Sequence, residues 1–132
     1  MCRSYLLSFL VLNLALLGCE NNEYSALSGK VTFQGKPLTV GTVSFKHKTA
    51  GTTGYGNLQS DGSYSVKTGR NAGLLRGEYA VYVVATEIIP SDGNSAPNVK
   101  LLIPSHYAEP ETSGLNCTVP AASDTYDIIL EK

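Results

Sequence analysis

Apolar and polar residues alternate in short runs from Ser25 to the C-terminus of this chain. Successive side chains of a β-strand point to opposite faces, so a period of two residues indicates strands with one buried face. The runs are separated by Gly, Pro, Asn and Asp, and none of them shows a helical period. The pattern predicts an all-β fold, a single antiparallel β-sandwich of about seven or eight short strands.

The expected strands differ in how much of their surface is covered. Residues 28–33 place Val31 and Phe33 on one face, and residues 42–45 place Val43 and Phe45 inward. Residues 77–86 are apolar in both registers, which predicts a central strand covered on both faces over much of its length. Further strands are expected at residues 56–60, 63–67, 100–103, 113–119 and 125–131.

Turns and loops are expected between these strands. Gln34-Gly35 turns the chain after the first strand. Asp61-Gly62 predicts a two-residue type I′ hairpin loop, because both positions of that loop need positive φ. The glycine-rich stretch 51–56 is expected to be a flexible approach to a strand, and 87–99 a loop whose polar part has little structure of its own.

Residues 1–18 have the pattern of a secretory signal peptide, with Arg3 in a short n-region and an apolar h-region over residues 6–17. About 20 apolar residues are needed to span a bilayer, so a cleaved signal is expected rather than a membrane anchor. The sequence Leu16-Leu17-Gly18-Cys19 resembles the lipobox of bacterial lipoproteins, in which Leu16 and Gly18 would admit the signal peptidase. The resemblance implies that the chain is cut before Cys19 and that this cysteine carries acyl chains such as palmitate. The alternative is an ordinary signal peptide that has a cysteine near its end.

Cleavage at this point divides the chain into three parts: a lipoprotein signal peptide (1–18), a lipidated tether (19–26) and one domain (27–132). We expect an exported protein anchored to a cell-envelope membrane, and the sequence leaves open whether this is the inner or the outer membrane. The tether from Glu20 to Ala26 spans at most roughly 25 Å, so a partner should be membrane-proximal.

Composition excludes some partners. The whole chain has 10 Lys and Arg against 11 Asp and Glu, a formal net charge of −1. Removal of Arg3 with the signal peptide leaves 9 basic against 11 acidic residues, a net charge of −2. The sequence has no basic stripe of the kind that binds nucleic acid. With Cys19 acylated and Cys2 removed, Cys117 is the one remaining thiol, and its alternating context predicts a small buried side chain. We expect a monomeric domain.

The order of several motifs resembles a known family. Residues 28–38, 41–45, Asp61-Gly62-Ser63-Tyr64 and residues 77–81 are similar to carboxypeptidase regulatory-like domains of the transthyretin-like class, and residues 103–115 look like small bacterial lipoproteins that carry one such domain. The resemblance implies a β-sandwich without catalytic activity or cofactor. Tyr79 is then expected to anchor a strand entry as a tyrosine corner does.

Few residues suggest chemistry. The chain has 2 histidines, His47 and His106, both expected in solvated loops, and no zinc-binding motif or second thiol that could join them. We therefore expect no metal and no cofactor, and an enzyme is the least favoured function.

Aromatic side chains are the better candidates for binding. The chain has 8 tyrosines and no tryptophan. Most of the tyrosines lie in alternating runs and are expected to pack, whereas Tyr55 and Tyr107, with His106, are the candidate ligand face, together with the loops 51–56 and 87–99. The function expected is a protein-interaction or structural module at the membrane; the alternative is a module that binds carbohydrate or cell-wall glycan.

Overall fold

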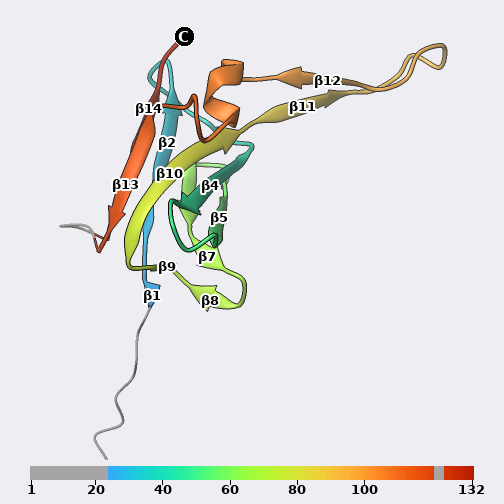
Figure 1. Cartoon of the computed structure of the whole chain (residues 1–132). Coiled ribbons are helices and arrows are strands. Elements are labelled where there is room, and N and C mark those ends of the chain that lie inside the picture. Colours follow the sequence, from blue (N-terminus) through green and yellow to red (C-terminus); the bar gives the residue numbers. More distant parts are fainter. Residues whose placement is uncertain (1–23, 121–123) are drawn as a thin grey trace, which may run out of the picture.

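The computed structural model describes residues 24–120 and 124–132. It consists of β-strands and one short 3₁₀ helix, arranged mainly as two sheets packed face to face (Figure 1). The all-β sandwich expected from the alternating pattern is therefore confirmed. The predicted signal peptide, Leu16, Gly18 and Cys19 lie outside the described residues. Within the predicted tether, Tyr24 and Ser25 form a strand that pairs with residues 74 and 75.

The larger sheet has six strands, and its hydrogen-bonded order is β13-β10-β4-β5-β7-β8. All neighbours in it are antiparallel. Its strands are β4 (Thr42–His47), β5 (Thr53–Asn57), β7 (Lys67–Thr68), β8 (Asn71–Ala72), β10 (Gly77–Val84) and β13 (Leu115–Val119).

The second sheet is built around β2 (Ser28–Phe33), which pairs with β3 (Lys36–Pro37), β6 (Ser63–Ser65) and β14 (Ile128–Leu130). The pairing of β14 with β2 is parallel, unlike the purely antiparallel sandwich that the sequence predicts. The reason is topological. After β13 ends in the larger sheet, the chain crosses to the other layer and runs beside β2 in the same direction.

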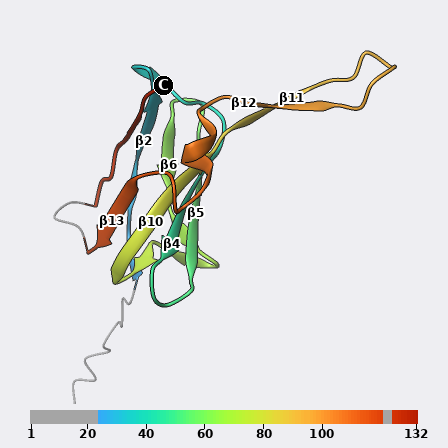
Figure 2. The ribbon, with the colours of Figure 1, turned by 45° about the horizontal axis from the view of Figure 1, so that its top comes forward.

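Two small ladders and the 3₁₀ helix complete the described chain. β1 (Tyr24–Ser25) pairs with β9 (Leu74–Leu75), and the helix η1 (Ser105–Ala108) lies against β10. β11 (Thr86–Ile89) and β12 (Asn98–Leu101) form a hairpin that projects from the sandwich (Figures 1 and 2). The predicted strand at 100–103 is thus found two residues earlier, as β12.

The core lies between the two sheets and follows the predicted alternation. Val31 of β2, Val43 and Phe45 of β4, and Leu130 of β14 are completely buried, and all belong to one hydrophobic cluster. Burial of each such side chain contributes about 1.5–3 kcal/mol to folding. Cys117 is also buried in this cluster, as its context predicts.

β10 is the central strand that the sequence predicts, lying between β13 and β4. Tyr79, Val81 and Val83 are buried on its inner face, but Tyr82 is half-buried and Val84 is exposed on the outer face. Coverage of both faces is therefore incomplete, although η1 contacts β10. The Tyr79 hydroxyl donates a hydrogen bond of 2.8 Å to the Leu75 carbonyl four residues upstream, as expected of a tyrosine corner.

The two predicted turns differ in outcome. Gln34 and Gly35 both have positive φ, 52° and 78°, and connect β2 to β3. At Asp61-Gly62 only Gly62 has positive φ, and its N–H donates to the Gln59 carbonyl. The type I′ prediction is wrong for this turn, because the loop is one residue longer and a single left-handed glycine closes it.

Candidate functional site

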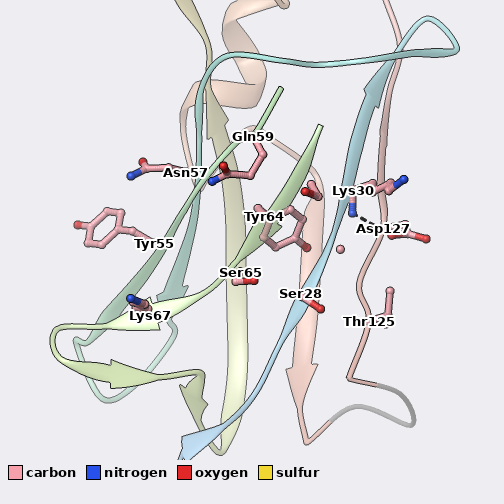
Figure 3. Close-up of a pocket in the computed structure, with 12 residues that line it drawn as sticks. Ser28, Lys30, Tyr55, Asn57, Gln59, Tyr64, Ser65, Lys67, Thr125 and Asp127 are labelled. Atoms are coloured by element: carbon pink, nitrogen blue, oxygen red, sulfur yellow. Dashed lines mark hydrogen bonds between the residues drawn. The ribbon is translucent and has the colours of Figure 1, made fainter. Parts of the chain in front are cut away.

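An open polar groove of about 800 Å³ lies on the surface formed by β5, β6, β7 and β2 (Figure 3). We call it the polar groove. On one side, β5 and β7 contribute Tyr55, Asn57 and Lys67, and Gln59 follows β5. The Asn57 side-chain oxygen accepts a hydrogen bond of 3.1 Å from the Thr42 hydroxyl, which fixes the orientation of the amide.

The opposite side is formed by β2 and the segment that enters β14. Lys30 and Asp127 line the groove there, and the Asp127 carboxylate accepts a hydrogen bond of 3.0 Å from the Lys30 backbone N–H (Figure 3). Ser28, Ser63 and Ser65 line the groove between the two sides. The groove therefore presents hydroxyl and amide groups, two aromatic rings (Tyr55 and, at the base, Tyr64), and charges of both signs.

The local sequence explains why β5 can form one wall. Gly54 and Gly56 are buried, whereas Tyr55 and Asn57 point to the outer face. A Cβ at Gly54 would lie 2.3 Å from Leu74 Cδ2, and a Cβ at Gly56 would lie 3.0 Å from Tyr64 Cδ2. The glycine-rich stretch expected to be a flexible approach is thus mostly strand, and its glycines allow β5 to approach the core closely.

The base of the groove is held by buried and turn residues. Tyr64 is 2% exposed, and its hydroxyl donates a hydrogen bond to the Tyr126 carbonyl, tying β6 to the segment before β14. Burial raises the pKa of Tyr64 far above its ordinary value. At the preceding turn, hydrogen bonds from the side chain and backbone N–H of Ser63 lower the pKa of Asp61.

The three residues of the expected ligand face are not brought into one site. Tyr55 is 52% exposed and lines the polar groove. His106 and Tyr107 belong to η1 and do not line it. The Tyr107 hydroxyl accepts a hydrogen bond of 3.1 Å from the Glu131 N–H, and the His106 ring packs at a tilt against the Tyr107 ring, with 4.1 Å between the ring centroids. These contacts give Tyr107 a structural part in joining η1 to the C-terminal segment.

His47 is buried, with 8% exposure, so its expected place in a solvated loop is wrong. β4 continues two residues beyond the predicted end, and His47 points inward at its last position. Its Nδ1 accepts hydrogen bonds from the N–H groups of Thr49 (3.1 Å) and Ala50 (2.8 Å). Nε2 therefore carries the proton and donates to the Arg76 carbonyl at 3.1 Å.

Within residues 24–120 and 124–132, no group of three His, Cys, Asp or Glu side chains could hold a metal ion.

Desolvation raises the pKa of the Cys117 thiol, which lowers its reactivity at neutral pH. In the same ranges no helix is both long enough and apolar enough to cross a membrane.

A second candidate surface is the hairpin of β11 and β12, where the sequence predicts a loop at 87–99. Only residues 90–97 lie outside the strands. Ile88 is opposite Val99, and Thr86 is opposite Leu101, so these four side chains share one face, which we call the hairpin face. The exposed fractions of Ile88, Val99 and Leu101 are 69%, 65% and 49%.

The signal for this hairpin was present in the sequence. Residues 86–89 and 98–101 are rich in β-branched and aliphatic side chains, which favour strands. The Ser, Asn, Asp and Gly residues between the two strands dominate the local composition and obscure the strand pattern.

No family model matches the chain, and no curated protein matches it. Among solved structures, a 9R-lipoxygenase from Cyanothece PCC8801 is similar with a TM-score of 0.39 and 13% sequence identity, over 84% of this chain. This chain spans only 17% of the length of that lipoxygenase chain.

Proposed function

We propose that this chain is a lipid-anchored cell-envelope protein whose non-catalytic β-sandwich, of the carboxypeptidase regulatory-like kind, docks a protein partner through the β11–β12 hairpin. The anchor is proposed from the lipobox-like sequence that ends at Cys19. The observation that best supports docking is the hairpin face, an exposed aliphatic surface on a ladder of only two strands.

A hairpin of this kind is poorly stabilised by itself. Within the described residues β11 and β12 pair only with each other, and all eight residues of the two strands are largely exposed except half-buried Thr86. Isolated two-stranded ladders are marginally stable in water. An added strand would satisfy the open backbone groups of one edge, and a cover over the hairpin face would remove its aliphatic side chains from water.

The size of the hairpin face favours an extended segment of another protein over a second copy of this chain. Its three aliphatic side chains expose roughly 300 Å², within the range of functional patches on monomers. A standard interface buries about 800 Å² on each partner, so two hairpin faces packed together would fall well short of it. A partner strand along the edge adds backbone hydrogen bonds and gains affinity without a large flat surface.

The place of the hairpin fits a membrane-proximal partner on the side of the domain that faces away from the lipid. β1 lies at the opposite end of the molecule from the hairpin (Figure 1). Only four residues lie between Cys19 and Tyr24, so the connection has five Cα-to-Cα steps and spans at most roughly 18 Å. An anchor at Cys19 would therefore hold the β1 end near the lipid and direct the hairpin away from it.

Site-specific photocrosslinking in native membranes tests the docking surface. A photoreactive residue at Val99, on the hairpin face, is compared with one at Lys100, the next residue on the opposite face of the same strand. We expect a discrete protein adduct from position 99 that is weak or absent from position 100 and is lost in Ile88→Asp. Equal adducts from both positions, or none from position 99, would exclude the hairpin face as the docking surface.

The anchor is tested separately. Cys19→Ser should leave an uncut precursor without acyl chains, detected by its mass and by the absence of a labelled fatty acid. Normal cleavage of this variant would contradict the proposed anchor and would leave the docking experiment unaffected.

A further inference from the structure

We propose that the polar groove is a second binding site, for a short neutral oligosaccharide. It is distinct from the proposed docking surface, because no residue of β11 or β12 lines the groove. Its volume of about 800 Å³ lies within the range of small-molecule sites. Because the groove is open to solvent, a short extended ligand could lie in it.

The groove offers polar groups that the protein itself does not use. Within the described residues, the side chains of Ser28, Ser65 and Gln59 make no hydrogen bond to another protein group. Hydroxyl and amide groups both donate and accept hydrogen bonds. Sugar hydroxyls do the same, so a polyhydroxylated ligand could pair with these groups without leaving a charge unpaired.

Tyr55 adds the aromatic surface that a sugar ring needs. Its side chain is half exposed and stands next to Lys67 in the pairing register of β5 and β7. The C–H face of a pyranose packs on an aromatic ring, while the phenol hydroxyl remains free to hydrogen-bond. The neighbouring Asn57 amide is fixed by Thr42 through its oxygen, so its NH₂ group is available as a donor.

The groove lacks the usual features of a phosphate site, although its two lysines and one aspartate give it a net charge of +1. Lys30 and Lys67 are accompanied by Asp127, and the groove contains no arginine. Phosphate sites generally use arginine forks or clustered backbone N–H groups. Here the backbone N–H of Lys30 is already bound to the Asp127 carboxylate, which would repel an anion from that side.

The test is calorimetric titration of the full chain, purified in a detergent without a sugar headgroup. The probes are maltotriose, xylotriose, mannotriose and the trimer of N-acetylglucosamine, each at up to about 5 mM, with inorganic phosphate as the anionic probe. We expect saturable binding of at least one trisaccharide. Tyr55→Ala and Ser65→Gln should each weaken it by about tenfold or more.

The matched control is Tyr82→Ala. Tyr82 lies on the same outer face of the sheet as Tyr55, because both residues are paired with Ser44 from its two neighbouring strands. Tyr82 does not line the groove. Its removal should change the affinity by less than about twofold if the variant remains folded by circular dichroism. The inference is overturned if no trisaccharide binds, if phosphate competes with the sugar, or if Tyr55→Ala binds as tightly as the parent chain. Ile88→Asp should retain sugar binding, which separates this result from the docking experiment.

Discussion

Replacement of His47 tests whether the buried histidine joins three segments of the chain. Its ring contacts the turn after β4 through Nδ1 and the residue before β10 through Nε2, and it packs edge-on against Tyr79 at 4.9 Å. Each of the three hydrogen bonds contributes about 1 kcal/mol net. The ring contact adds about 0.5–1 kcal/mol. His47→Ala should therefore lower the free energy of unfolding by about 3–4 kcal/mol.

Two further variants separate the two sides of the ring. The amide oxygen of His47→Asn can occupy the place of Nδ1 and accept from Thr49 and Ala50, whereas the amide nitrogen of His47→Gln can replace only the Nε2 donor to Arg76. His47→Asn should recover about half of the free energy of unfolding that His47→Ala loses, and His47→Gln should recover less. Urea unfolding followed by circular dichroism measures the three values. If His47→Asn is no more stable than His47→Ala, the Nδ1 hydrogen bonds do not contribute as argued.

Three other changes follow from the same core. The pKa of Tyr64 is raised in the native protein, whereas Tyr64 of the unfolded chain ionises above pH 10.0. The free energy of unfolding should therefore fall as pH rises beyond that value, by up to about 1.4 kcal/mol per pH unit. Tyr64→Phe should reduce this dependence on pH, measured by urea unfolding at alkaline pH. Gly54→Ala should cost about 2 kcal/mol or more, because its Cβ would meet Leu74 Cδ2 at 2.3 Å; a thermal midpoint unchanged from the parent chain would contradict this close approach. In a chain with Cys2 and Cys19 replaced by serine, Cys117 should react with a thiol reagent only after unfolding, and rapid labelling of the native protein would show that the thiol is accessible.

The sequence predicts well the features that depend on nearby residues. The inward alternation of β2 and β4, the turn at Gln34-Gly35 and the burial of Cys117 follow from the two-residue period and from glycine geometry. Tyr79 could also be anticipated as a tyrosine corner, because its hydroxyl bonds only four residues upstream.

Features that depend on distant pairing were missed. The parallel register of β14 beside β2 joins residues about a hundred positions apart, and no local pattern fixes its direction. His47 is polar, but its burial depends on backbone partners in two other segments. The polar groove likewise brings together residues from 28 to 127, of which only Tyr55 was singled out by its own context.

Docking at the hairpin is tested by amide hydrogen exchange, measured by mass spectrometry on native membranes and on the purified chain. The purified chain should exchange quickly throughout residues 86–101, because β11 and β12 form a two-stranded ladder within the described residues. On membranes that contain the partner, strand addition should slow exchange in β11 or β12 while β4 and β10 remain unchanged. Equal exchange of the hairpin in both preparations would contradict docking at this surface.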